Sequence, residues 1–276
     1  MSVQVDRYAV IGNPIAHSKS PLIHRLFAEQ TQQNLDYQAV FVPLGEFETK
    51  VDELFAQGLR GCNVTIPFKQ NAWAFAHELS SYAQIAGALN TLMLRADQSI
   101  YGHNTDGLGM MRDLLVNKQV ALQGKRVLVL GAGGAVRGII QPLLEAQPAL
   151  VQLANRTAAT ASDLANEFKP YGEIMGGGFD AINASFDIII NGTAASLQGE
   201  LPELPANCLG EGGIGYDMMY GSEPTPFMRW AYEQRAVQVF DGLGMLIEQA
   251  AEAFELWRGI RPDTQPVFAA LVQQFK

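Results

Sequence analysis

Cysteine is scarce in this sequence of 276 residues, and no apolar run is long enough to cross a membrane. The two cysteines, Cys62 and Cys208, have no paired spacing and no histidine cluster beside them, so neither a disulfide framework nor a metal site is indicated. The longest apolar runs, such as Val127–Leu130 and Ile188–Ile190, fall far short of the roughly 20 residues that a spanning helix needs. The sequence therefore predicts no bound metal and no membrane partner.

Positive charge is also limited. Lys and Arg total 19 against 28 Asp and Glu, which gives a formal net charge of −9. Nucleic-acid binding needs concentrated basic residues, so we expect no nucleic-acid partner. One arginine or a helix N-terminus can still hold a phosphate in an acidic protein. The first residues lack the basic start and long apolar stretch of a secretory signal, so we expect a cytoplasmic protein.

The chain is too long for one comfortable core, and we expect two domains. Apolar runs alternate with helical segments in both halves, which predicts an α/β fold with two mostly parallel sheets and a boundary near residue 107. Ser20 and Pro21 suit the N-cap and first position of a helix. The expected strands are 8–12, 36–42, 61–66, 125–130, 150–154, 188–191 and 213–217. The tail after Gly242 carries one apolar helical face, formed by Leu246, Ala250, Ala253, Phe254 and Trp257.

A glycine-rich turn follows the strand expected at 125–130. Its residues are Gly131, Ala132, Gly133, Gly134 and Ala135. Such a turn lets the backbone approach a pyrophosphate, whose charge then lies on the free N–H groups of the next helix. Val136 stands where the strict pattern has glycine or alanine, and glycine turns also serve as simple connections. The position after a strand favours a dinucleotide site.

The next strand ends at Asn155, Arg156 and Thr157. An NAD-binding site usually has an acidic residue there to bind the ribose hydroxyls. Arg156 instead offers a planar cation for a 2′-phosphate, so NADP is favoured over NAD. Without the upstream glycines, Arg156 would be interpreted as an ordinary solvated cation.

Polar turns cluster in the first half of the chain. Ser18 and Ser20 could hold a small carboxylate at a helix start, although Ser20 could instead be an ordinary cap. The segment 63–69 ends an expected strand, and strand ends are where open parallel sheets bind ligands. Asn90-Thr91 and Asn104-Thr105-Asp106-Gly107 add two more polar turns, each of which alone would be ordinary turn chemistry.

Together these segments, with 241–246, resemble the shikimate dehydrogenase family in its chain order, nearly from end to end. The resemblance implies reversible NADPH-dependent reduction of 3-dehydroshikimate to shikimate, a step of chorismate and aromatic amino-acid biosynthesis. It implies a substrate-binding catalytic domain of residues 1–106 and 241–276 and a Rossmann-type NADP-binding domain of residues 107–240, with the last helices returning to the first domain. The expected state is a monomer or a homodimer.

The resemblance also assigns residues. It implies that Lys69 and Asp106 form the catalytic pair. It implies that shikimate is contacted by Ser18, Ser20, Thr65, Asn90, Tyr216 and Gln249. It implies that NADP is contacted by Gly131, Ala132, Gly133, Gly134, Ala135, Asn155, Arg156, Thr157, Thr193, Ile214 and Gly242. Gly192 stands where the family often has alanine.

Reduction of the ketone leaves an alkoxide that must be protonated, and a charged Lys69 would be the donor, oriented by Asp106. Oxidation needs the neutral amine of Lys69, so we expect it to speed up with rising pH. Three alternatives stay open: an NAD-dependent quinate/shikimate dehydrogenase, a sensor that binds shikimate without turnover, and a folate-linked methylene dehydrogenase. Arg156 argues against the first alternative, the Lys69–Asp106 pair against the second, and the paired serines and asparagines, which suit a small carboxylate with several hydroxyl groups, against the third.

Overall fold

The computed structural model describes residues 5–193, 195 and 200–274. The described residues form two compact units. The first unit runs through Gly109 and takes in Ile247–Leu271, and the second comprises Met110–Leu246 with the few residues after Leu271. The divisions fall within the helices α5 (Asp106–Arg112), α9 (Leu243–Arg258) and α10 (Gln265–Gln274). The binding roles and the exact bounds expected for the two domains stay predictions.

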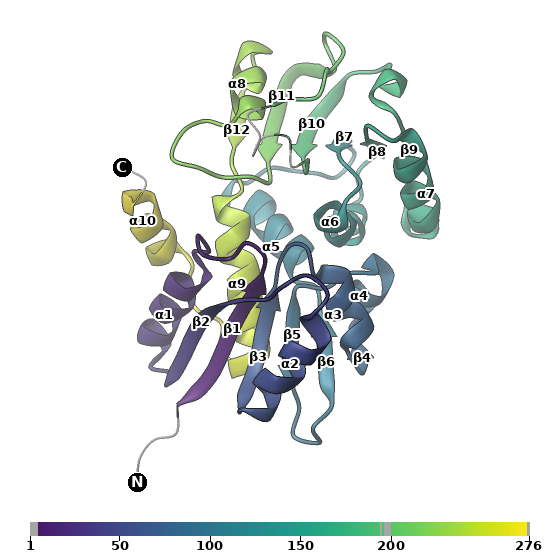
Figure 1. Ribbon diagram of the computed structural model, residues 1–276. Coiled ribbons are helices and arrows are strands. Elements are labelled where there is room, and N and C mark those ends of the chain that lie inside the picture. The colour runs from purple at the N-terminus through teal and green to yellow at the C-terminus, as the bar shows by residue number, and fades with distance from the viewer. Residues whose placement is uncertain (1–4, 194, 196–199, 275–276) are drawn as a thin grey trace. The chain divides into compact units, whose positions relative to one another are not determined.

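The first unit is built on a six-stranded sheet with the order β2-β1-β3-β5-β6-β4 (Figure 1). Its strands are β1 (Asp6–Gly12), β2 (Leu35–Phe41), β3 (Leu59–Val64), β4 (Glu78–Leu79), β5 (Thr91–Leu94) and β6 (Ile100–His103). Three of its five strand pairs are parallel, as the predicted mostly parallel sheet requires. β5 is antiparallel to both β3 and β6, which was not predicted. The polar turn expected at 104–107 directly follows β6, and its last two residues begin α5.

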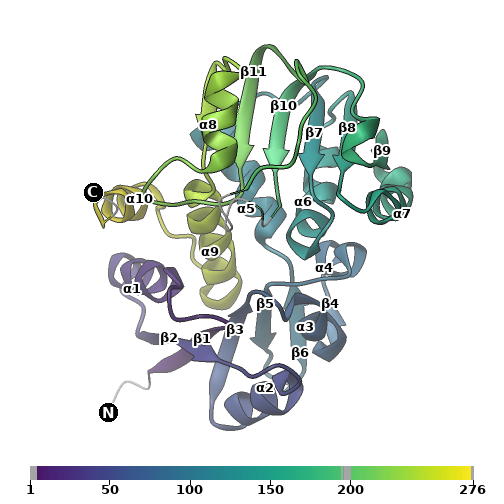
Figure 2. The same cartoon turned by 45° about the horizontal axis from the view of Figure 1, so that its top comes forward.

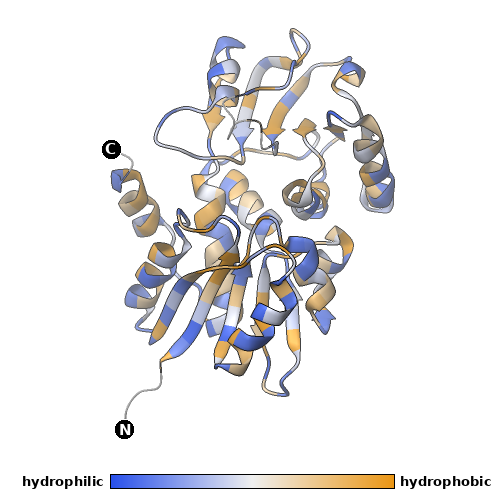
Figure 3. Ribbon diagram, viewed as in Figure 1, coloured by the Kyte–Doolittle hydropathy of each residue, from blue (hydrophilic) through white to orange (hydrophobic). Residues whose placement is uncertain are grey.

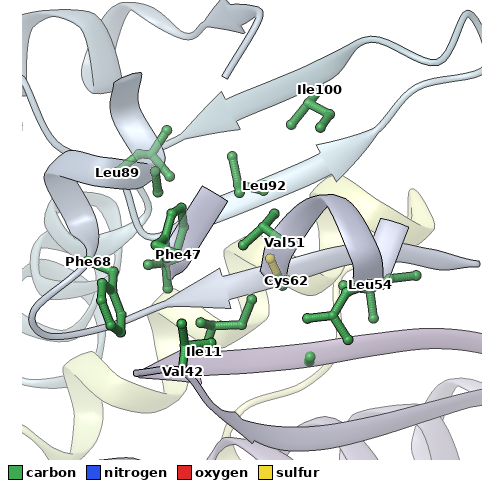
Figure 4. Close-up of a cluster of buried hydrophobic side chains, with 14 of the residues drawn as sticks. Ile11, Val42, Phe47, Val51, Leu54, Cys62, Phe68, Leu89, Leu92 and Ile100 are labelled. Carbon is green, nitrogen blue, oxygen red and sulfur yellow. The ribbon is translucent and has the colours of Figure 1, made fainter. Parts of the chain in front are cut away.

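Side chains of β1 alternate between the two faces of this sheet, as strand geometry requires. Ala9 and Ile11 join the apolar cluster beneath α2 (Phe47–Ala56) and α3 (Lys69–Phe75), shown in Figure 4. The short α4 (Ser81–Ala86) contributes Ala83 to the same cluster. Tyr8 and Val10 pack on the opposite face with Tyr37 and Trp257. The sheet is therefore covered by helices on both faces.

Helix α1 (Ser20–Thr31) begins one residue earlier than expected. Lys19 occupies the N-cap position, and its side chain makes no capping hydrogen bond. The prediction that Ser20 is the N-cap was wrong, because the backbone of Ser20 is already helical. Its hydroxyl is thus not used as a helix cap.

The second unit is built on a fully parallel sheet with the order β12-β11-β10-β7-β8-β9 (Figure 1), and Figure 2 shows β11, β10, β7, β8 and β9 of this sheet from a second side. Its strands are β7 (Arg126–Leu130), β8 (Leu150–Ala154), β9 (Ile174–Gly177), β10 (Phe186–Asn191), β11 (Leu209–Asp217) and β12 (Gln238–Phe240). From β7 the chain proceeds outward through β8 and β9, and from β10 outward through β11 and β12. The direction of winding therefore reverses between β7 and β10, which is where open α/β sheets bind ligands.

Helices and short turns pack on this second sheet. They are η1 (Asp113–Asn117), α6 (Gly134–Glu145), α7 (Ala158–Phe168), η2 (Lys169–Tyr171), η3 (Phe179–Ala181) and α8 (Pro226–Glu233). β7 and β10 lie in the middle of the sheet and contain the apolar runs Val127–Leu130 and Ile188–Ile190, and Figure 3 shows hydrophobic colouring in both strands. Phe186 and Phe227 are fully buried in a core cluster with Leu128 and Ile189. Strands buried on both faces explain the continuous apolar runs in the sequence.

The amphipathic tail forms α9, which packs on the first sheet. Ala250, Ala253 and Phe254 are fully buried, as its spacing predicts. A Cβ placed on Gly61 of β3 would lie 2.6 Å from the indole nitrogen of Trp257, so only glycine admits this ring. The same nitrogen donates a hydrogen bond of 3.1 Å to the carbonyl of Leu92. Within the described ranges, no helix is both long and apolar enough to cross a membrane.

Candidate active site

One edge of the first sheet collects the polar turns that the sequence singles out. β1, β3 and β6 end at this edge, and the antiparallel β5 begins there. Asn63, Thr91 and His103 are aligned across the sheet near the edge. The turns 13–19, 65–68, 88–90 and 104–105 therefore leave the sheet on the same side. This arrangement depends on β5 being antiparallel, because only then does Asn90 precede a strand at that edge.

Lys69 and Asp106 are in direct contact. The ammonium group of Lys69 donates to Oδ2 of Asp106, although the two residues lie 37 positions apart. Lys69 is the first residue of α3 and Asp106 the first residue of α5. The Asn104 side chain accepts a hydrogen bond of 3.1 Å from the Asp106 backbone N–H, which fixes the start of α5. Asp106 is 6 % exposed and Lys69 is half-buried, so this ion pair is sheltered from solvent.

The side chain of Asn90 joins this pair to α9. Its amide nitrogen lies 2.9 Å from Oδ1 of Asp106, 2.9 Å from Oγ1 of Thr105 and 3.0 Å from Oε1 of Gln249. Gln249 can approach because Gly109 has no side chain: a Cβ there would lie 2.5 Å from the backbone nitrogen of Gln249. Both oxygens of Asp106 are thus engaged by donors, one from Asn90 and one from Lys69.

Ser18, Ser20 and Thr65 lie at the same edge of the first sheet. The hydroxyl oxygen of Ser18 accepts from the backbone N–H of Ser20 at 3.3 Å, so the two serines share one turn. A Cβ placed on Gly12 would lie 2.6 Å from the Thr65 methyl group, which shows how closely the ends of β1 and β3 approach. Ser18 and Thr65 are partly exposed, whereas Ser20 is buried. Among the residues that the structure describes, no hydrogen bond joins these three directly to the Lys69–Asp106 pair.

Tyr216 differs from the other expected shikimate contacts. It lies in β11 of the second unit and has no exposed surface. Its hydroxyl donates to Oδ2 of Asp113 at 2.9 Å. Burial, followed by the neighbouring Asp113, raises the pKa of Tyr216 well above its ordinary value. The hydroxyl is therefore hydrogen-bonded within the second unit, and a contact of Tyr216 with shikimate stays a prediction.

The glycine turn lies at the point where the second sheet reverses its winding. Gly131 follows β7 with φ of +104°, a conformation that favours glycine, and a Cβ there would lie 3.2 Å from the carbonyl oxygen of Gly192. Nothing lies within 4 Å of a Cβ built on Gly133 or Gly134. Helix α6 starts at Gly134, and no side chain caps it. The turn therefore presents open space in front of unoccupied backbone N–H groups, the arrangement that binds phosphate.

The turn after β8 carries Arg156. Asn155 donates its side-chain amide to the carbonyl of Thr157 at 3.1 Å, which shapes this turn. Thr157 is the N-cap of α7 but makes no side-chain cap. The Arg156 side chain is exposed, and among the described residues no hydrogen bond or ion pair engages its guanidinium group. β8 is hydrogen-bonded next to β7, so this cation stands one strand away from the glycine turn.

Three further predicted cofactor contacts lie in the second unit. Thr193 is held by Asn191, whose Oδ1 accepts from its backbone N–H at 3.2 Å and from its hydroxyl at 2.8 Å. The Thr193 methyl group would be 3.4 Å from a Cβ on Gly131, so Thr193 lies beside the glycine turn. A Cβ on Gly242 would collide with the carbonyl of Met218, just beyond β11.

Ile214 lies further from the strand ends than the other expected cofactor contacts do. It pairs with Ile188 of β10, and Ile188 pairs with Val127 of β7, so all three lie three residues before the ends of their strands. Three residues of a strand span about 10 Å. Ile214 therefore lies about 10 Å before the edge that carries the glycine turn, and its contact with the cofactor stays a prediction.

Some residues of the site were missed from sequence. Thr105 donates through its backbone N–H to Oδ1 of Asn90 at 2.9 Å, and Asn191 donates its side-chain amide to Asp217 at 3.0 Å. Thr105 lies in an Asn-containing turn whose composition suggested turn formation alone, and Asn191 is the last residue of β10. Burial is the signal that separates them from ordinary turns, because all four are almost fully buried. In the described part of the chain, no group of three or more His, Cys, Asp or Glu residues could hold a metal ion.

Three family models match the chain. The model described as "Shikimate dehydrogenase substrate binding domain" matches residues 10–92, "Shikimate / quinate 5-dehydrogenase" matches residues 114–198, and "Shikimate 5'-dehydrogenase C-terminal domain" matches residues 242–271. They cover both compact units and the segment that begins with Gly242.

Relatives that match nearly the whole chain point to the same family as these models. The shikimate dehydrogenase (NADP(+)) of Cellvibrio japonicus is 56% identical over 270 residues, covering 98% of each chain. That of Alkalilimnicola ehrlichii is 54% identical over 266 residues, covering 96% of this chain and 98% of the relative. A solved structure of shikimate 5-dehydrogenase from Thermus thermophilus, in complex with NADP(H) and shikimate, is 33% identical, with a TM-score of 0.87 and coverage of 99% and 100%. An Ael1 enzyme from Pseudomonas putida gives a TM-score of 0.90 at 48% identity, with coverage of 96% and 98%. This chain belongs to the shikimate dehydrogenase family.

Proposed function

We propose that this protein catalyses the reversible NADPH-dependent reduction of 3-dehydroshikimate to shikimate in aromatic amino-acid biosynthesis. The observation that carries the proposal is the contact between Lys69 and Asp106 at a polar sheet edge, in a chain that matches its family from end to end. A cytoplasmic location and a monomeric or homodimeric state remain predictions from the sequence.

Lys69 is the proposed acid. NADPH would supply the hydride, and the carbonyl oxygen of the substrate would then carry developing negative charge that needs a proton. The Lys69 ammonium group can donate that proton. Its hydrogen bond to Asp106 holds the ammonium group in place. Asp106 is itself oriented by Asn90, whose amide can only donate to a carboxylate. In the reverse direction, the neutral amine of Lys69 would accept the proton of the shikimate hydroxyl.

The remaining substrate residues would hold the ring. Asn90 and Gln249 come from separate elements and meet beside Asp106, so they offer amide donors and acceptors to neighbouring hydroxyl groups. Ser18, Ser20 and Thr65 would bind the carboxylate and a further hydroxyl group, at the turn where α1 begins and at the end of β3. Buried donors of this kind reject a ligand that lacks the matching oxygen.

The second unit fits a dinucleotide with a 2′-phosphate. The open space at Gly133 and Gly134 and the uncapped start of α6 suit the pyrophosphate, with Ala132 and Ala135 in the same turn. Arg156 would bind the 2′-phosphate through paired N–H donors, beside Asn155 and Thr157. Thr193 and Gly242 are proposed to lie along the cofactor. As the family resemblance implies, Tyr216 is proposed to contact shikimate and Ile214 to lie near the cofactor.

The test is an assay of hydride transfer by the purified protein. Shikimate and quinate are each mixed with NADP⁺ and with NAD⁺, and the absorbance of the reduced nicotinamide is followed. Turnover that strongly favours shikimate with NADP⁺ supports the proposal. Comparable or better turnover of quinate with NAD⁺ would identify a quinate/shikimate dehydrogenase instead. Saturable shikimate binding without any turnover would identify a sensor.

A further inference from the structure

A row of buried polar side chains crosses the first sheet beneath the catalytic pair. It runs from Tyr37 on β2 to Asn63 on β3 and Thr91 on β5, and it ends at Asn90. All four are at least nine-tenths buried. Uncompensated polar groups in such a place are costly, and each member of this row has a hydrogen-bond partner.

The direction of each hydrogen bond in the row is fixed by backbone groups. The backbone N–H of Thr105 can only donate, so it must face the oxygen of the Asn90 side chain, at 2.9 Å. The backbone carbonyl of Asn90 can only accept, so it must face the amide nitrogen of Asn63, at 3.2 Å. The oxygen of Asn63 is then left for Tyr37, whose hydroxyl donates to it at 2.7 Å.

The bonds therefore all point one way. Tyr37 donates to Asn63, Asn63 donates to Thr91 at 3.1 Å, and Thr91 donates to Asn90 at 3.0 Å. Asn90 in turn donates to Asp106 at 2.9 Å. Bonds in one direction polarise one another, so loss of the first donor weakens the hold on the last acceptor.

Tyr37, the first donor of the row, packs against a neighbouring ring. The imidazole ring of His24 on α1 lies parallel to the ring of Tyr37, with centroids 4.1 Å apart and planes 5° apart. The Tyr37 hydroxyl also lies within hydrogen-bonding reach of Ser20. Tyr37 can therefore act by two routes, through Asn63 toward Asp106 or through Ser20 toward a bound carboxylate.

We infer that Tyr37 is a positioning residue for catalysis, which acts through Asn63 to fix the Asn90 amide against Asp106. This inference rests on the proposed function, because it gives Tyr37 a part in placing Asp106 for that reaction. The Asn63 route contains more bonds with fixed direction than the Ser20 route, and it ends on the catalytic pair itself. Removal of the hydroxyl should thus slow the chemical step more than it weakens substrate binding.

The test compares Tyr37→Phe with a matched control, Tyr8→Phe. Tyr8 is an equally buried tyrosine on the same sheet face, and its hydroxyl bonds to Arg258 rather than to the row. Calorimetric titration with shikimate gives both the affinity and the fraction of binding-competent protein, so kcat can be expressed per competent site. We expect Tyr37→Phe to lower kcat about three- to tenfold, with shikimate affinity within about twofold, and Tyr8→Phe to leave both unchanged.

The Tyr37→Phe change is also made in an Asn63→Leu variant, which shows whether Tyr37 acts through Asn63. In Asn63→Leu, which removes the intermediate amide at similar size, the added Tyr37→Phe change should have no further effect on kcat. Equal kcat for the two tyrosine variants, a loss confined to shikimate affinity, or additive losses in the double variant would each overturn the inference. If the wild-type protein does not oxidise shikimate, the proposed function fails first, whereas normal wild-type turnover with any of those results sinks this inference alone.

Discussion

The carboxylate of Asp106 contacts the ammonium group of Lys69 across 37 positions of the chain, and each residue is the first of its helix. A carboxylate at the start of a helix is favoured by the exposed N–H groups there. Asp106 therefore has three sources of positive potential, namely Lys69, the Asn90 amide and the start of α5. The pair is preassembled within one unit, so its formation needs no ligand.

Replacement of the catalytic lysine should separate chemistry from binding. Lys69→Ala removes the proton donor, so we expect kcat to fall by orders of magnitude while shikimate affinity stays within a few-fold. Lys50→Ala, at a solvent-facing lysine of α2 paired with Glu53, is the matched control and should retain full activity. Steady-state kinetics with calorimetric binding measures both quantities. A loss restricted to affinity would make Lys69 a binding residue.

Shikimate oxidation by the wild-type protein should speed up as pH rises from neutral toward alkaline values. The reason is that the neutral amine of Lys69 is the proposed proton acceptor. The measurement is kcat/KM for shikimate across this range, with C3-deuterated shikimate used to show that hydride transfer is limiting. A flat profile under limiting hydride transfer would count against Lys69 as the base.

Reversal of charge at the turn after β8 should change cofactor preference. Arg156→Asp places a carboxylate where the 2′-phosphate is expected, so NADP⁺ affinity should fall by about tenfold to a hundredfold and NAD⁺ affinity far less. Lys169→Asp makes the same charge change at the other end of α7 and serves as the control. Dissociation constants for both cofactors test this, and equal effects on the two would remove the 2′-phosphate assignment.

A methyl group at Gly109 should disturb the site through α9. Its Cβ would lie only 2.5 to 2.8 Å from backbone and side-chain atoms of Gln249. Gly109→Ala should therefore destabilise the protein by about 1 to 3 kcal/mol despite the better helix propensity of alanine, and it should raise KM for shikimate. Chemical unfolding and kinetics measure these effects, and NADP⁺ affinity should not change. Unaltered stability and KM would show that α9 moves aside freely.

Acid should destabilise the protein through His24. Burial lowers the pKa of His24 to about 3 from an ordinary value of 6.5, so below pH 6.5 the unfolded chain binds a proton that the folded protein refuses. Stability is then lost as pH falls, by about 2 kcal/mol between pH 6.5 and 4.5 for this one group. Burial of His103, whose pKa falls to about 4, adds a loss of the same sign.

The measurement is the free energy of unfolding in denaturant at several pH values. His24→Leu should show a shallower decline with falling pH than the wild type, whatever its stability at pH 7. His17→Gln, at an exposed histidine, should reproduce the wild-type slope. Parallel declines in wild type and His24→Leu would mean that His24 does not take part.

Much of the fold could be predicted because the relevant strands have simple sequences. β7, β8 and β10 are buried runs of Val, Leu and Ile, and periodicity locates them to within two residues. β5 and β6 were missed because their four-residue strands adjoin Asn- and Thr-rich turns, so turn composition dominated the pattern. β9 was not predicted because glycines form the second half of this short strand. Gly176 is required there because a Cβ would collide with the carbonyl of Ala161 on α7.

The residues of the site could be predicted from the sequence more fully than the contacts between them. Spacing along the chain cannot show that Lys69 meets Asp106, because that contact depends on the register of β3, β5 and β6. The same register creates the row from Tyr37 to Asn90, in which no two successive members except Asn90 and Thr91 are neighbours in sequence.

The packing of α9 on the first sheet also sets an order of events during synthesis. Arg258 bonds to Asp6 across 252 positions, and Trp257 lies against Gly61. While a ribosome is still translating the second unit, the face carrying Tyr8 and Val10 has left the exit tunnel without its cover. The second unit, almost entirely the unbroken stretch Met110–Leu246, can close before that cover is made. The half of the protein that begins the chain is thus the last to be completed.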